Sequence, residues 1–198
     1  KLAIKFFSTR FNNKSNALWY LVFFCSGALA LAYEVLWFKE LNLLLGSTVH
    51  AVTLLFASFF ACMALGGYWG GKFLARTQNI ARTYALLELS IACGALLYMG
   101  ILRLLVARGE WMWEIVGESA FLLFITKFLL GVGLLFLPAL LIGATFPVMV
   151  ELLTRGGRGF AKIGSAIYAS NTLGGVVGAC LAGLYFPPWF GYTTSYLL

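Results

Sequence analysis

The sequence predicts an all-α fold: a polytopic bundle of five complete transmembrane helices followed by the start of a sixth. Only 11% of its 198 residues are charged and 62% are hydrophobic, whereas soluble proteins are about 25% charged. The chain also contains five long apolar runs, each sufficient for the roughly 20 residues that a helix needs to cross the hydrocarbon. Short polar or glycine-rich segments separate these runs. We therefore expect helices that cross the membrane in alternating directions, with the lipid bilayer as partner.

Two regions are expected, a basic cytoplasmic tail over residues 1–16 and a transmembrane helical domain over residues 17–198. The tail has four basic residues with phenylalanines between them. It is therefore either a short amphipathic helix on an anionic membrane face or a disordered tail. The first span runs from Ala17 to about Leu41, and its glycines and alanines form a stripe on which another helix can pack.

The second span runs from about Val49 to Gly71, and Ser47 or Thr48 can cap its start. Pairs with GxxxG spacing allow the backbones of membrane helices to approach closely. Two overlapping pairs of this kind close the span: Gly66, Gly67, Gly70 and Gly71.

The third span covers Thr83 to about Ala107, and an interfacial turn over residues 108–118 follows it. The fourth apolar stretch runs from Ser119 to Leu152 and would measure about 50 Å as a straight helix. Proline lacks an N–H and disturbs a helix interior. We therefore expect Pro138 and Pro147 to kink or break this stretch.

The fifth span runs from about Lys162 to Phe186, where Pro187 and Pro188 are expected to stop it. Residues from Trp189 onward begin a sixth apolar segment, and the first residue of the chain is Lys. We therefore expect the chain to be part of a longer polypeptide at both ends. A second small-residue ladder in the fifth span includes Gly174, Gly175, Gly178 and Gly183.

The formal charge of +7 is interpreted as an orientation signal, not as a nucleic-acid surface. Ten lysines and arginines lie on the side of the N-terminus and three on the other side, with Lys127 inside the fourth span. Because cytoplasmic loops are richer in basic residues, the N-terminus is predicted to lie in the cytoplasm.

The sequence predicts no metal site and no cofactor. Its four cysteines lie within apolar runs without CxxC spacing, and it has a single histidine, His50. Cysteines in this setting are typical of small hydrophobic residues.

Glu34 is the first candidate for a ligand-binding site, because ionisable residues inside membrane spans are costly and usually functional. It can bind a cation, a proton or an amine. Two structural alternatives stay open: an ion pair with Lys127 or Arg103, and a protonated carboxyl hydrogen-bonded to a backbone carbonyl. By helical spacing Glu34 shares a face with Trp37.

Asn171 lies in the middle of the fifth span. A membrane asparagine either joins two helices by a hydrogen bond or contributes to a site. The candidate ligand-binding residues are Glu34, Trp37, Lys127 and Asn171.

Several phrases, in order, resemble the membrane region of bacterial integral-membrane spermidine synthase-like proteins, in which a major-facilitator-like part is fused to a polyamine aminopropyltransferase. These phrases are Tyr33-Glu34-Val35-Leu36-Trp37, Gly46-Ser47-Thr48-Val49-His50-Ala51, and residues 60–71, 87–89, 141–147 and 168–178. The resemblance implies a major-facilitator-like half in the bacterial inner membrane. It also implies a non-catalytic domain that anchors a soluble domain or passes small molecules to it.

Two departures from the family are clear. Ala75 precedes Arg76 where the loop motif of major-facilitator transporters has an acid, and the chain contains no Asp and no Gly-rich βαβ region for an aminopropyltransferase. Any catalytic domain is therefore expected beyond Leu198 or to be lost. The alternatives are a structural or accessory subunit of a larger membrane complex or homo-oligomer, and half of a secondary transporter.

Overall fold

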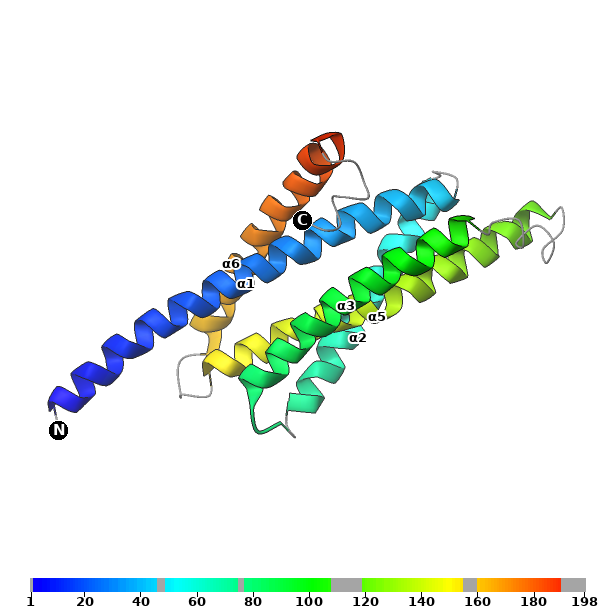
Figure 1. Ribbon diagram of the computed structural model, residues 1–198. Coiled ribbons are helices and arrows are strands. Elements are labelled where there is room, and N and C mark those ends of the chain that lie inside the picture. The colour runs from blue at the N-terminus through cyan, green and yellow to red at the C-terminus, as the bar shows by residue number, and fades with distance from the viewer. Residues whose placement is uncertain (1, 46–48, 75–76, 108–118, 155–159, 190–198) are drawn as a thin grey trace. The chain divides into compact units, whose positions relative to one another are not determined.

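A computed structural model (Figure 1) describes residues 2–45, 49–74, 77–107, 119–154 and 160–189. Within these ranges every regular element is a helix, so the predicted all-α class is confirmed. The long helices are α1 (Leu2–Leu45), α2 (Val49–Leu74), α3 (Ile80–Ala107), α5 (Ala120–Thr154) and α6 (Phe160–Cys180).

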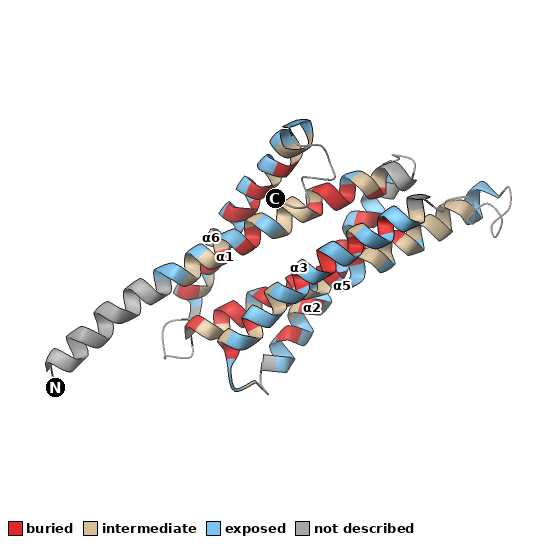
Figure 2. Cartoon of the chain, viewed as in Figure 1, coloured by how far each residue is buried: buried red, intermediate tan, exposed pale blue. Residues whose placement is uncertain are grey.

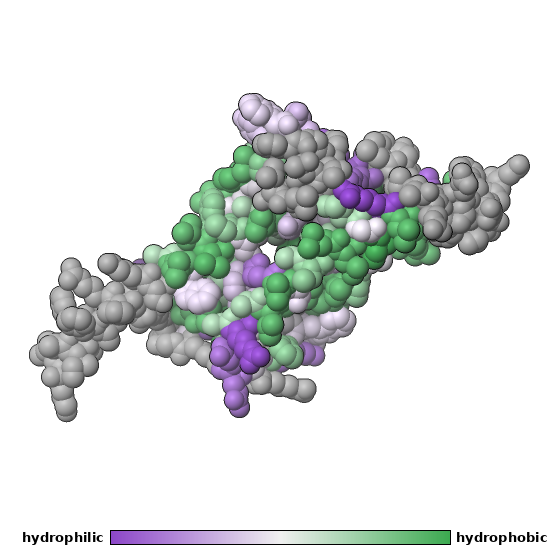
Figure 3. All heavy atoms as spheres, viewed as in Figure 1, coloured by the Kyte–Doolittle hydropathy of each residue, from purple (hydrophilic) through white to green (hydrophobic). Residues whose placement is uncertain are grey.

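Each of the five long helices, with α6 taken together with the helical residues that follow it to Trp189, has a segment that is long and apolar enough to cross a membrane. These segments are Ala17–Asn42, Val52–Phe73, Ile80–Leu105, Ala120–Thr154 and Ala161–Trp189. Figure 3 shows that the visible side chains of the spans are mostly hydrophobic, as contact with lipid requires. The chain therefore has the helices of a multi-pass membrane protein. The expected cap at Ser47 or Thr48, the turn at residues 108–118 and the start of a sixth span lie outside the described residues.

The helical backbone of α1 begins at Leu2 and passes residue 16 without a break. The disordered alternative for the tail is therefore not what the structure has. At 1.5 Å per residue, the 44 residues of α1 extend about 65 Å.

Two polar side chains fix where α3 and α5 begin. The side-chain oxygen of Asn79 accepts a hydrogen bond from the backbone N–H of Arg82 at 3.1 Å. Ser119 Oγ accepts one from the N–H of Leu122 at 3.4 Å. Both are N-cap contacts, which satisfy donors that have no partner in the first turn of a helix.

The prolines were expected to kink or break the fourth span, and a break is wrong, because α5 continues across both Pro138 and Pro147 as one helix of 35 residues. Each proline removes one hydrogen bond, but membrane helices tolerate this where hydroxyl groups and local adjustments re-satisfy the backbone. Near Pro147, Thr145 Oγ1 donates to the carbonyl of Ile142 at 2.7 Å, which is not the carbonyl that Pro147 leaves without an α-helical donor.

The fifth span also continues further than expected. A π-helical turn, η1 (Leu181–Tyr185), follows α6 directly, and helical backbone extends through Pro187 and Pro188 to Trp189. The two prolines do not stop the helix at Phe186, because the wider π turn before them already departs from α-helical hydrogen bonding.

The chain forms two compact units, and each is described by itself. The first unit comprises Lys1–Leu36 and Met149–Leu198, and the second comprises Trp37–Val148. In Figure 2 buried and exposed residues alternate along the helices. Each helix therefore packs through one stripe and leaves the opposite stripe to lipid.

In the first unit, α1 and α6 run parallel and touch through backbone atoms. Ser170 Oγ donates to the carbonyl of Tyr20 at 2.8 Å. One turn further along both helices, a Cβ added at Gly174 would overlap the backbone carbonyl of Phe24. After another turn, a Cβ at Gly178 would overlap that of Ala28. The contacts advance four residues at a time on both helices, which is the ridge spacing of closely packed helix pairs.

In the second unit, α2 and α5 also run parallel and touch reciprocally. A Cβ at Gly66 of α2 would overlap the carbonyl of Leu140 in α5, and one at Gly143 of α5 would overlap the carbonyl of Met63 in α2. One turn further, a Cβ at Gly70 would lie 3.0 Å from the Cα of Ala144. Such approaches allow weak Cα–H···O contacts between helices.

We predict that Gly66→Ala destabilises the protein while Gly71→Ala does not. The new methyl group at position 66 meets the backbone of α5, which cannot yield like a side chain, whereas a Cβ at Gly71 meets nothing within 4 Å. Overpacking costs about 1–3 kcal/mol, and Ala in an open helical position is favourable by up to about 1 kcal/mol. Thermal unfolding in detergent would measure both changes. Equal effects of the two substitutions would contradict the close α2–α5 contact.

Candidate functional site

Glu34 is a nearly fully buried carboxylate in the first unit, with 7% of its surface exposed. Only two other polar or charged residues in the described part of the chain are buried to this extent, Ser26 and Thr145. Among the described residues of its own unit, Glu34 forms no hydrogen bond and no ion pair. These residues therefore do not supply the compensation that buried charges normally have.

The described side chains of the first unit offer Glu34 little positive charge. Among them Lys162 is the only lysine or arginine, and it is exposed at the start of α6. The hydrogen bond from Ser170 to the carbonyl of Tyr20 shows that these two residues lie at the same height along the paired helices. In these parallel helices, Lys162 therefore lies roughly 12 Å before that level and Glu34 roughly 21 Å beyond it. The separation of roughly 30 Å prevents an ion pair.

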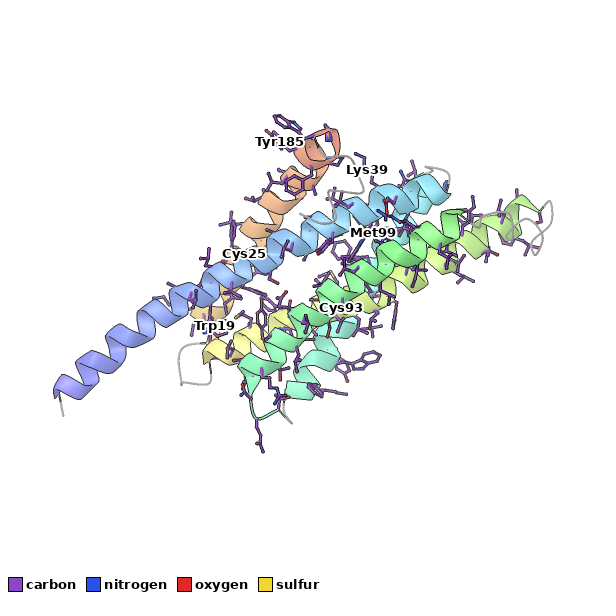
Figure 4. The ribbon with its side chains drawn as sticks, in the orientation of Figure 1. Trp19, Cys25, Lys39, Cys93, Met99 and Tyr185 are labelled. Atoms are coloured by element: carbon purple, nitrogen blue, oxygen red, sulfur yellow. The ribbon has the colours of Figure 1, made fainter. Side chains whose placement is uncertain are left out.

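The candidate ligand-binding residues fall into different units. Glu34 and Asn171 belong to the first unit, whereas Trp37 and Lys127 belong to the second, together with Arg103. Lys127 is half-buried in α5 and Arg103 is exposed on α3. Figure 4 shows Cys25 and Lys39 on α1, and Glu34 lies between them in the sequence.

Trp37 is part of a hydrophobic core. Its side chain is fully buried, and its ring lies 5.1 Å from that of Tyr98 on α3. The Tyr98 hydroxyl donates to the backbone carbonyl of Trp37 at 3.4 Å. Phe38 extends this core, since it stacks on Phe56 at 4.2 Å and meets Phe59 edge-on at 5.8 Å. Trp37 thus fixes the end of α1 against α3, which is a structural role.

Asn171 lies at the contact between α1 and α6. A Cβ at Gly27 would be 2.6 Å from the side-chain oxygen of Asn171 and would overlap its backbone carbonyl. Glu34 is seven residues further along α1, which is about 10 Å. Asn171 therefore lies too far along the helix to reach the Glu34 carboxylate.

Sequence reasoning singled out neither Tyr98 nor the buried Ser26 and Thr145. Tyr98 lies in a leucine-rich run that resembles any lipid-facing segment, and only its packing against Trp37 gives it a role. Serine and threonine carry no signal in a membrane helix, because their hydroxyls can bond to the preceding turn of the same helix.

No metal site is evident in the described part of the chain. No group of three or more His, Cys, Asp and Glu side chains there could hold a metal ion. His50 is exposed at the start of α2. All four cysteines are free, and Cys62 is the buried one.

We predict that Glu34→Gln leaves the protein as stable as the wild type or makes it more stable. Gln keeps the shape and removes a charge whose burial in a membrane helix costs about 2.5–3.5 kcal/mol on insertion scales. Thermal unfolding and the amount of folded protein in the membrane would be measured. If Glu34 instead had an essential ion pair, breaking that pair would destabilise the protein by about 3–5 kcal/mol. A loss of this size would exclude the ligand-binding role.

Comparison with known proteins adds no family assignment: no protein-family model, no curated protein and no solved structure matches this chain.

Proposed function

We propose that this chain is the non-catalytic membrane domain of a spermidine synthase-like protein. Its role is to anchor a soluble domain and to pass small cationic molecules to or from it by way of Glu34. The observation that carries the proposal is the buried Glu34 carboxylate, which has no partner among the described residues of its own unit. The resemblance of the ordered sequence phrases supports the choice of family, and polyamines are cations of the kind a buried carboxylate attracts.

A charge requirement supports a cationic substrate. Among the described side chains of its own unit, Glu34 has no lysine or arginine within reach, so a cation or proton that neutralises the carboxylate would stabilise it. A negatively charged ligand would instead add repulsion in a medium of low dielectric constant. The charge of the site therefore favours cations over anions, whatever the shape of the ligand.

The proposed location is the bacterial inner membrane with the N-terminus in the cytoplasm. At the end of α2, on the proposed cytoplasmic side, the Lys72 ammonium lies 4.3 Å from the centre of the Tyr68 ring. Tyr68, Trp69 and Phe73 are exposed there. Aromatic and basic residues together are typical of the membrane–water interface. In this orientation Glu34 lies in the outer half of its span.

A second candidate is an accessory subunit of a membrane complex. Some glycines have open space where a Cβ would point: Gly71, Gly100, Gly133 and Gly164. A helix of another chain could approach closely at such positions. Co-purification of a protein in fixed stoichiometry would favour this candidate over the first.

Transport of labelled putrescine and spermidine into liposomes that contain the purified protein tests the proposal. We expect Glu34→Gln to reduce amine uptake by about tenfold or more, because charge-assisted hydrogen bonds to the carboxylate are lost. Glu88→Gln is the matched control, since Glu88 is a second glutamate within a span and is only half-buried, and it should leave uptake within about twofold of wild type. Wild-type liposomes no more permeable than empty ones would refute amine passage.

The orientation has its own test, in a background in which Cys25, Cys62, Cys93 and Cys180 are replaced by Ala. Lys39→Cys and Lys162→Cys then place single thiols at exposed positions near opposite ends of the spans. A membrane-impermeant maleimide should label position 39 in intact cells and position 162 only after permeabilisation, since cytoplasmic segments carry the basic excess. The reverse pattern would invert the proposed orientation.

A further inference from the structure

We infer that the π turn at the end of α6 completes a binding site for a small monovalent cation around Glu34, with the backbone carbonyl of Gly183 as a second ligand. This inference rests on the proposed role of Glu34. It adds a second element to the site and names the class of ligand.

The backbone carbonyl of Gly183 has no hydrogen-bond donor within its own helix. In an α-helix its donor would be the N–H of residue 187, and in a π-helix that of residue 188. Both positions are proline, which has no N–H. The N–H of Phe186 is already engaged, because it donates to the carbonyl of Leu181.

Gly183 itself lies beside the part of α1 that carries Glu34. A Cβ at Gly183 would be 3.7 Å from Cγ1 of Val35, the residue after Glu34. Ala182, within the same π turn, is fully buried. A glutamate side chain is long enough to reach a neighbouring helix at such a contact. An unused backbone acceptor and a buried carboxylate are thus brought to one level of the first unit.

These two ligands offer only acceptor oxygens and a single negative charge. That combination suits a hard monovalent ion such as Na⁺ or a primary ammonium group, which has three donors. A quaternary ammonium has no N–H and cannot approach the oxygens as closely. Interrupted helices in transporters bind cations in the same chemical way, through backbone carbonyls that their helix cannot use.

The test is thermal unfolding of the purified full chain in detergent with NaCl, ethylammonium chloride or choline chloride at equal ionic strength. We expect Na⁺ or ethylammonium to raise the unfolding temperature of the wild type in a saturable manner, and choline to leave it unchanged. The cation that stabilises the protein identifies the ligand as an inorganic ion or an amine. Equal effects of all three salts would overturn the inference.

Two kinds of variant test the two ligands separately. Glu34→Gln should abolish the saturable shift. Pro187→Ala supplies an α-helical N–H that competes for the Gly183 carbonyl, so it should weaken the apparent affinity by about tenfold, the effect of one hydrogen bond to a charged group. Pro188→Ala supplies the π-helical donor instead and serves if Pro187→Ala does not fold. Pro138→Ala in α5 is the matched control and should bind like the wild type.

The outcomes separate this inference from the proposed function. If Glu34→Gln removes the shift but both variants at positions 187 and 188 bind normally, the carbonyl ligand is wrong while the role of Glu34 stands. If the wild type transports amines but no cation stabilises it, the site inferred here is wrong and the proposed function survives. If neither transport nor stabilisation occurs, both are wrong.

Discussion

The close approach of parallel helix backbones is the constraint on which both units depend. In lipid, apolar side chains gain little by leaving the solvent, so helices must associate through packing and polar contacts. Gly174 and Gly178 meet the carbonyls of α1, and Gly66 and Gly143 meet the carbonyls across the α2–α5 contact. Any side chain at these points would separate the helices and remove the contacts around them. The remaining faces of the helices are free to present leucines and aromatic residues to lipid.

Glu34 and the end of α6 are exceptions to the rule that polar groups inside a membrane protein have hydrogen-bond partners. A helix in lipid normally pairs each of its polar groups within itself. At Pro187 and Pro188 the helical pairing fails for the Gly183 carbonyl, and Glu34 is a buried carboxylate without a partner among the residues of its unit that the structure describes. Membrane proteins keep such groups where they line a binding site or a path. The two departures lie at one level of the first unit, and the inferred site depends on this coincidence.

The spans could be predicted because they depend on local composition. The second helix begins at Val49 as expected, and α5 begins at Ala120, one residue after the expected start. The predicted end of the fifth span was wrong, because the missing N–H groups of Pro187 and Pro188 were treated as a stop, whereas helical backbone continues through both to Trp189. In the site, the burial of Glu34 follows from its sequence. The packing of Trp37 on Tyr98 does not, because helical spacing shows which residues share a face but not which helix that face meets.

The length of α5 has a consequence for the membrane itself. Its 35 residues measure about 52 Å, and even a tilt of 40° leaves about 40 Å along the membrane normal. This exceeds the roughly 30 Å hydrocarbon of an average bilayer. The excess must protrude from the lipid or thicken it locally, and either response has a free-energy cost that falls as the bilayer thickens. The lipid composition of the host membrane therefore acts on this helix directly, and a thicker bilayer suits it better than a thin one.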